Sequence, residues 1–150
     1  MSVTLPIEGG CMCGQVRLRI SAPPLITMAC HCTGCQKLSA SAFSLTAMIP
    51  AAGFEVIKGE PQIGALHGAS KYFYCPHCLN WLYTIPAMAI QFVNVRPAMF
   101  DVLAWSKPFI ESFTSEKLPW ATTAAKHSFE RFPAPEQYGM LVAEFAAQAG

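Results

Sequence analysis

Short runs in which apolar and polar residues alternate dominate the first two thirds of the chain. VRLRI (16–20) sets the pattern, because every second side chain is a Val, Leu or Ile, as in a half-buried strand. Pro, Gly and polar residues separate the runs, and turn signals every 8 to 12 residues or so are typical of all-β sheets and barrels. The pattern predicts a mainly β fold, with strands at 16–20, 26–30, 43–49, 54–60, 70–75, 81–85 and 90–95.

The last thirty residues show a different pattern. In 135–150, Pro135 stands at a helix start, and Met140, Leu141 and Phe145 follow at helical spacing. This predicts a short helical tail. A shorter helix is predicted over 121–129, and one helical turn in TGCQKLSAS (33–41).

Length and composition favour a single domain spanning 1–150. Hydrophobic residues make up 53% of the chain and charged residues 13%, against about 25% charged in an average soluble chain. Few charges are therefore left to cover the surface, and a homodimer that covers part of the apolar surface is one expectation.

The charge pattern argues against a nucleic-acid partner. The formal net charge is only +1, and the ten Lys and Arg residues are scattered singly and form no basic stripe. No apolar stretch approaches the roughly 20 residues of a membrane-spanning helix. The N-terminus lacks the basic and apolar regions of a signal peptide, so the expected location is the cytoplasm.

All seven cysteines fall in three short motifs, GGCMCG, CHCTGC and CPHC. Their number is odd and no secretion signal precedes them, which argues against a disulfide framework and favours metal ligands. The residues are Cys11 and Cys13, then Cys30, Cys32 and Cys35, then Cys75 and Cys78.

Seven ligands divide naturally as four plus three. Structural zinc takes four thiolates or imidazoles, whereas catalytic zinc takes three protein ligands and keeps one position for water or substrate. The first and third motifs together supply four thiolates, which predicts a structural site. CHCTGC alone supplies three, which predicts a second, open site.

Three alternatives remain at this point. CPHC alone is also compatible with a thioredoxin-like redox pair, although strands are predicted on both sides of it. CHCTGC is compatible with an iron–sulfur cluster, although its spacing is not that of common ferredoxins. Both sites are compatible with purely structural zinc, in which His31, His77 or another side chain supplies the eighth ligand.

The histidines and one lysine supply weaker signals. His31 and His77 stand between ligands, so we expect their side chains to point away from the metal and to donate hydrogen bonds to a sulfur. His67 and His127 are compatible with ordinary surface residues. Lys37 follows CHCTGC and would offset the net charge of −1 of three thiolates and Zn²⁺, or would simply be solvated.

The motifs GGCMCGQVRLRI, CHCTGCQKLSASAF and YFYCPHCLNWLY together resemble the glutathione-dependent formaldehyde-activating enzyme family, which includes centromere protein V. The resemblance covers about residues 7–133. It implies a β-rich, Mss4-like fold, and the same division into a four-cysteine structural zinc and a three-cysteine catalytic zinc. It also implies carbon–sulfur chemistry, in which formaldehyde adds to the thiol of glutathione to give S-hydroxymethylglutathione.

Three positions depart from the family pattern. Gln36 stands where Arg is common, and Ala40 and Leu79 stand where Gly is usual. A residue larger than glycine fills space beside the backbone and changes the pocket. These departures therefore bear on the identity of the substrate more than on the metal ligands. Glutathione carries two carboxylates, and Lys37 and Lys71 are candidate cations to orient it.

Together these observations predict a zinc-dependent carbon–sulfur lyase that forms or cleaves an adduct of an aldehyde with glutathione or a related small thiol. Its candidate catalytic residues are the three cysteines of CHCTGC. The alternative is a non-catalytic module with two zinc ions that binds a protein partner.

Overall fold

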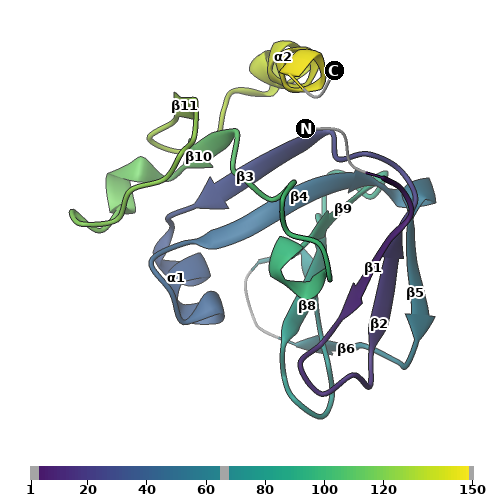
Figure 1. The fold of residues 1–150 in the computed structure, drawn as a ribbon. Helices are drawn as coiled ribbons and strands as arrows, with labels where there is room; N and C mark the ends of the chain where they lie inside the picture. Colours follow the sequence, from purple (N-terminus) through teal and green to yellow (C-terminus); the bar gives the residue numbers. More distant parts are fainter. Residues whose placement is uncertain (1–3, 65–67, 149–150) are drawn as a thin grey trace.

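Two sheets form the body of the molecule (Figure 1). The computed structural model describes residues 4–64 and 68–148. The smaller sheet is antiparallel, in the order β1 (Ile7–Gly10), β2 (Arg17–Ile20) and β5 (Phe54–Lys58). The larger sheet has the order β11 (His127–Ser128), β10 (Ile110–Ser112), β3 (Ile26–Cys30), β4 (Ser44–Pro50), β9 (Phe92–Val95), β8 (Trp81–Ile85), β7 (Lys71–Tyr74) and β6 (Gln62–Gly64).

Two α-helices and four short 3₁₀ helices complete the part of the chain that the structure describes. Neither α-helix is long and apolar enough to cross a membrane, within these same residues. The helices are η1 (Ala51–Gly53), η2 (Pro97–Met99), η3 (Thr114–Glu116), η4 (Pro135–Gln137), α1 (Thr33–Ser39) and α2 (Tyr138–Gln148).

The expected mainly β fold is confirmed, and each of the seven expected strands has a counterpart. Two of them, β3 and β8, have the expected bounds. The sequence pattern missed β1, β6, β10 and β11. β6, β10 and β11 have only two or three residues, which is too short for an alternating pattern to stand out, and two of the four residues of β1 are glycines, which are rare in strands.

The main core lies between the two sheets. Leu18 and Ile20 of β2 face Ala47 and Ile49 of β4 in one buried cluster, which continues to Leu82 of β8. These side chains are fully buried. Burial of each Leu or Ile among them stabilises the fold by about 1.5 to 3 kcal/mol relative to exposure. Burial of these alternate positions fixes the register of both sheets, because a shift by one residue would turn them outward.

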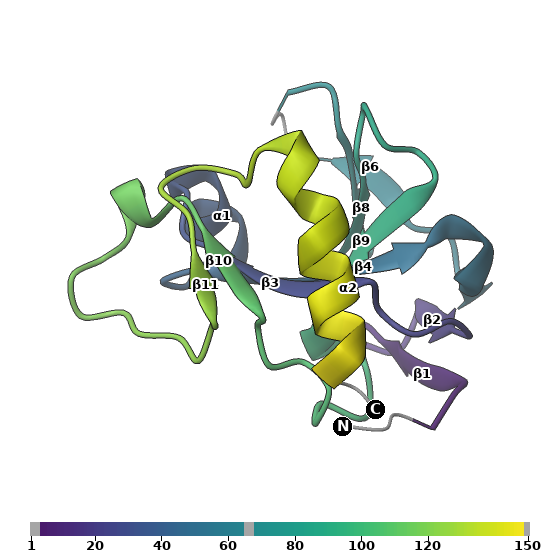
Figure 2. The ribbon, with the colours of Figure 1, turned by 90° about the horizontal axis from the view of Figure 1, so that it is seen from above.

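The helix α2 covers the opposite face of the larger sheet, across β3 and β4 (Figure 2). Leu141 and Phe145 pack against Ile26 and Met28 of β3 in a second apolar cluster. The expected helical tail over 135–150 is therefore confirmed for the residues that are described, which end at 148. A polar contact adds to the packing, because Glu144 of α2 pairs with Lys126 and His127.

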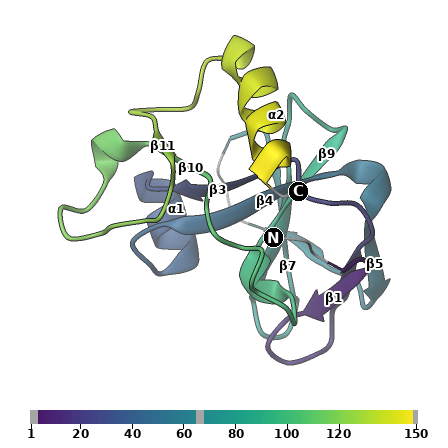
Figure 3. The ribbon, with the colours of Figure 1, turned by 45° about the horizontal axis from the view of Figure 1, so that its top comes forward.

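The helix expected over 121–129 is wrong. This segment is extended, and its end forms β11, which runs parallel to β10 (Figure 3). The Lys126 N–H donates to Phe109 O at 2.8 Å, and the Phe129 N–H donates to Glu111 O at 2.9 Å. The edge of β10 thus supplies the partners that a helix would have found internally, and the β-branched Thr122 and Thr123 favour extended backbone. His127 lies at the surface, as expected, and its Nε2 lies 2.9 Å from Glu144 Oε2. His67 lies outside the described residues.

Candidate metal centres

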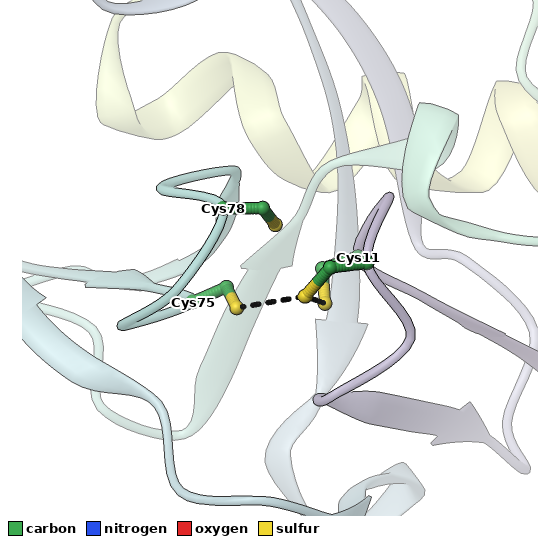
Figure 4. Close-up of side chains that lie close together, drawn as sticks. Cys11, Cys75 and Cys78 are labelled. Carbon is green, nitrogen blue, oxygen red and sulfur yellow. Dashed lines mark hydrogen bonds between the residues drawn. The ribbon is translucent and has the colours of Figure 1, made fainter.

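Four cysteines meet where the β1–β2 loop approaches the β7–β8 turn. Cys11, Cys75 and Cys78 converge from these two connections (Figure 4). With Cys13, their sulfur atoms all lie within 4.8 Å of one another, and we call this group the four-cysteine cluster. It joins the smaller sheet to the larger one, as the division of seven cysteines into four and three predicted.

Backbone hydrogen bonds shape both connections. The Cys11 N–H donates to Val16 O at 3.1 Å, and the Cys75 N–H donates to Asn80 O at 3.1 Å, so each pair closes its own turn. The Asn80 side chain also ties the two together, because its Oδ1 accepts the Met12 N–H at 2.7 Å. The sulfur atoms are therefore held by local backbone geometry on both sides.

The geometry of the four-cysteine cluster fits zinc. A Zn–S bond of about 2.3 Å puts the corners of a tetrahedron about 3.8 Å apart. Cys13 Sγ lies 3.5 Å from Cys11 Sγ and 3.6 Å from Cys75 Sγ. Burial raises the pKa of Cys11, but the Val16 N–H, which donates to its sulfur at 3.3 Å, and the neighbouring thiols outweigh this and lower that pKa to about 6. A thiolate, the form that binds metal, is thus favoured at this corner.

The remaining three cysteines form a second group at the junction of β3 and α1. Cys30 ends β3, Cys32 caps the N-terminus of α1, and Cys35 lies within that helix. Their sulfur atoms all lie within 4.8 Å of one another, and we call this group the three-cysteine cluster. The helical turn expected in TGCQKLSAS (33–41) is confirmed as α1, which begins at Thr33, so CHCTGC is a strand–helix junction and not a loop alone.

Contacts among the three thiols make Cys35 the most acidic of them. The Cys30 thiol lowers the pKa of Cys35, against an opposing effect of burial, and the Ser44 hydroxyl lowers it further. Conversely, Cys35 and burial raise the pKa of Cys30, and burial raises that of Cys32. The Cys35 N–H donates to Cys32 Sγ at 3.3 Å, which orients the second thiol toward the group.

Among the described residues, no further His, Cys, Asp or Glu joins this cluster with a ligand atom. The three sulfur atoms fit a metal with three protein ligands and a fourth position for another molecule. CPHC, by contrast, joins two strands and shares its cluster with two more cysteines, which favours metal ligation over a thioredoxin-like redox pair. All seven cysteines are free thiols in the structure.

The hydrogen bond expected from His31 to a sulfur is not found. The His31 side chain is fully buried, and its Nε2 lies 2.8 Å from Glu111 Oε2. Its Nδ1 has no hydrogen-bond partner within residues 4–64 and 68–148. His31 points away from the three sulfur atoms, as expected from its position between two ligands, but toward a carboxylate. His77 is exposed on the β7–β8 turn.

Glu111 is the centre of the hydrogen-bond network that includes His31, and it was not among the residues predicted from the sequence. Its carboxylate accepts from Ser128 Oγ at 2.7 Å, from Thr123 Oγ1 at 2.8 Å, and from Lys117 Nζ at 3.0 and 3.1 Å, in addition to its contact with His31. Burial raises the pKa of Glu111, but these donors outweigh it and hold that pKa at about 2. The network fixes His31, and with it the backbone between Cys30 and Cys32.

The lysines expected to orient a substrate are both exposed. Lys37 lies in the last turn of α1, the helix that carries Cys35. Lys71 begins β7, and strand alternation puts it on the opposite face from Tyr72. The cation buried beside the three-cysteine cluster is Arg96 instead. One feature of the sequence indicated this. Asn94 and Arg96 are polar residues at alternate positions, and alternate positions of a strand share a face.

Two of the three departures from the family pattern coincide with left-handed backbone. Ala40, which ends α1, has φ of 47°, and Leu79 has φ of 61°. Such angles favour glycine because a Cβ atom crowds the following carbonyl. Gln36, the third departure, holds the junction together, since its Nε2 donates to His31 O at 2.7 Å and to Glu116 O at 3.1 Å.

This backbone geometry predicts that Leu79→Gly stabilises the protein by about 1 kcal/mol, measured by urea unfolding. The Leu79 side chain is 70% exposed, so little packing is lost, and its N–H still reaches Cys75 O at 3.0 Å. Met88→Gly is the matched control, because Met88 is 96% exposed in a turn and is not among the residues with positive φ. Equal effects of the two substitutions would contradict the explanation.

A mainly β, two-sheet protein with a four-cysteine and a three-cysteine cluster defines an Mss4-like metal-binding class. The family model for the glutathione-dependent formaldehyde-activating enzyme matches residues 6–116, and the chain belongs to that family. A crystal structure of a Rhodobacter sphaeroides protein is similar, with a TM-score of 0.54 and 16% sequence identity, and the match covers 63% of this chain and 87% of that one. At this identity the likeness concerns the fold alone. No curated protein matches the chain.

Proposed function

We propose that the protein is a zinc-dependent carbon–sulfur lyase, which forms or cleaves an adduct between a small aldehyde and the thiol of glutathione or a related small thiol. Family membership supports glutathione-dependent formaldehyde chemistry. The observation that carries the proposal is the separation of the cysteines into two clusters, one with four sulfur atoms and one with three. A purely structural site needs the fourth ligand that the second cluster lacks among the described residues.

Each cluster has its own role in this proposal. The four-cysteine cluster would hold a structural zinc ion between the two sheets. Cys30, Cys32 and Cys35 would hold the second ion, and zinc there lowers the pKa of a bound thiol so that a thiolate forms near neutral pH. In the addition, the sulfur forms a bond to the aldehyde carbon, and the proton of the thiol ends on the carbonyl oxygen. Cleavage of the adduct is the reverse.

The chain's own residues would position the thiol. The Glu111–His31 contact holds the strand–helix junction in place, so the three sulfur atoms need little rearrangement on binding. Lys37 is the better placed of the two candidate cations for the glutathione carboxylates, because it lies two residues after Cys35 on the same helix. Lys71 remains the second candidate. We propose further that the enzyme acts in the cytoplasm.

Metal analysis tests the two-site part of the proposal. We expect about two zinc ions per chain in the wild-type protein and one in Cys32→Ser, which should stay folded because Cys32 lies at the strand–helix junction outside the main core. One ion or none in the wild-type protein would contradict the division. Circular dichroism of the same samples shows whether the variant has kept its fold.

Cobalt substitution tests the binding of a thiol. With Co²⁺ in both clusters, we expect glutathione to change the sulfur-to-cobalt charge-transfer bands, and formaldehyde to change them again. Cys32→Ser, which keeps only the four-cysteine cluster, should show neither change. An unchanged wild-type spectrum would mean that no thiol reaches the metal. That result would favour the alternative, a non-catalytic module that binds a protein through exposed apolar residues such as Trp120 and Phe132.

A further inference from the structure

Arg96 is a buried cation without a carboxylate partner among the described residues. It follows β9 directly, and only 8% of it is exposed. By contrast, Arg17 and Arg19 lie at the surface and form ion pairs with Asp or Glu. Burial of an unpaired guanidinium is strongly unfavourable unless something else compensates the charge.

The contacts of Arg96 hold it in place but leave its charge uncompensated. Its Nη1 donates to Thr46 Oγ1 at 2.8 Å and to Leu45 O at 3.3 Å, and its Nη2 donates to Asn94 O at 3.3 Å. Its guanidinium carbon lies 3.8 Å from the centre of the Trp81 ring. All of these partners are neutral, and its Nε has no hydrogen-bond partner in the part of the chain that the structure describes. A formal negative charge is still missing.

The three-cysteine cluster lies on the same side of the sheet. Cys30 pairs with Ser44 across β3 and β4, and Thr46 follows two positions later on β4, so all three side chains share one face. Ser44 and Thr46 are about 7 Å apart along the strand. Arg96 donates a hydrogen bond to Thr46, and Ser44 lies opposite Cys30, so the cation and the thiols lie at the two ends of one short polar row.

The acidic groups around Arg96 point to the same partner. Burial lowers the pKa of Arg96 to about 10, and the groups whose negative charge opposes this are Cys35, Tyr72, Cys30 and Tyr74. Both tyrosines stay neutral near pH 7, because burial raises the pKa of Tyr72 to about 12 and raises that of Tyr74 as well. This leaves the cysteine thiolates as the negative charge that Arg96 can balance.

We propose that Arg96 is the counter-cation of the three-cysteine cluster, a positioning residue whose buried charge offsets the net −1 of zinc held by three thiolates. The inference rests on the two-zinc part of the proposed function. A cation in this place makes the site neutral before a substrate thiolate binds, so a further negative ligand meets less repulsion. It takes the role that the sequence suggested for Lys37, whose exposed charge is screened by water and salt.

The test compares zinc affinity in charge-changing variants. Competition with a chromophoric zinc chelator should show that Arg96→Met weakens the three-cysteine site about 10- to 100-fold. Arg96→Lys, which keeps the charge, should stay within a few-fold of wild type. In the Cys32→Ser background only the four-cysteine site remains, and there Arg96→Met should have no effect.

Two matched controls separate buried from exposed charge. Lys37→Met removes the exposed cation nearest to the cluster in the sequence, and Arg17→Met removes an arginine that lies at the surface beside Asp101. We expect less than a twofold change at the three-cysteine site in both. If Lys37→Met weakens this site as strongly as Arg96→Met does, or if Arg96→Lys is as weak as Arg96→Met, the proposal is wrong.

Folding of the variants is checked separately by circular dichroism. Arg96→Gln, which is neutral but still able to donate to Thr46, replaces Arg96→Met if that variant does not fold. If neither neutral variant folds while Arg96→Lys does, the charge serves the fold and the proposal is overturned. One zinc ion in the wild-type protein would instead contradict the two-site function itself, so the two failures are distinguishable.

Discussion

Cys75→Ser is expected to remove one of two zinc ions and to lower the free energy of unfolding by about 5 kcal/mol or more. Cys75 is fully buried, belongs to the main apolar core, and lies in the turn that brings the larger sheet to the β1–β2 loop. Serine would leave a buried hydroxyl in place of a metal–sulfur bond. Domains of this size are stable by only about 5 to 15 kcal/mol, so the substitution should remove a third or more of that stability.

Thermal and urea unfolding, with metal analysis of the same samples, measure this effect. Cys32→Ser is the matched control, because it makes the same chemical change in the three-cysteine cluster and should lose one ion without unfolding. A strong chelator added to the wild-type protein should destabilise it about as much as Cys75→Ser does. The structural role of the four-cysteine cluster would be refuted by a Cys75→Ser protein that unfolds at the wild-type temperature.

Part of the site could be predicted from the sequence, as the two clusters show. The cysteines could be divided correctly from their number and spacing, because each motif brings its own sulfur atoms together locally, and four plus three results only when the two pairs combine. Strands such as β3 and β8 were predictable because each is a run of five residues in which apolar, β-branched or aromatic side chains predominate. The short β10 was not, and so neither was Glu111, which depends on β10 lying beside β3 although some eighty residues separate Glu111 from His31.

The burial of Arg96 was not predicted, and the helix over 121–129 was predicted wrongly, for the same physical reason. A charged residue at the end of a strand is usually exposed, and only the packing of β4, β8 and β9 around Arg96 buries it. The segment 121–129 has a weak local preference, and the edge of β10 decides its conformation. In both cases the partner comes from a distant part of the chain, and local patterns carry no information about it.

Glu111→Gln is expected to destabilise the protein by about 3 kcal/mol at pH 7, measured by urea unfolding. The amide keeps the size of the side chain but removes the charge that Lys117 needs, and it replaces an acceptor oxygen with a donor in a buried network of Ser128, Thr123 and His31. Glu144→Gln is the matched control. Glu144 accepts from Lys126 and His127 at the surface, where such pairs contribute about 1 kcal/mol or less.

The dependence of stability on pH gives the second and sharper form of this prediction. The pKa of Glu111 is about 2 in the folded protein, against 4.5 for an unperturbed glutamate. Because the folded value is lower, the stabilisation is fully present above pH 4.5 and is lost as the pH falls toward 2. The difference of 2.5 between these pKa values corresponds to about 3 kcal/mol.

The wild-type protein should therefore lose about 3 kcal/mol more than Glu111→Gln between pH 5 and pH 2. Other carboxylates titrate equally in both proteins, so the difference between the two curves isolates Glu111. Parallel curves would contradict the network. Since Glu111 holds His31 between two ligands of the three-cysteine cluster, the same titration should show whether the strand–helix junction loosens with it. In that case zinc would leave the three-cysteine cluster at a higher pH in Glu111→Gln than in Glu144→Gln.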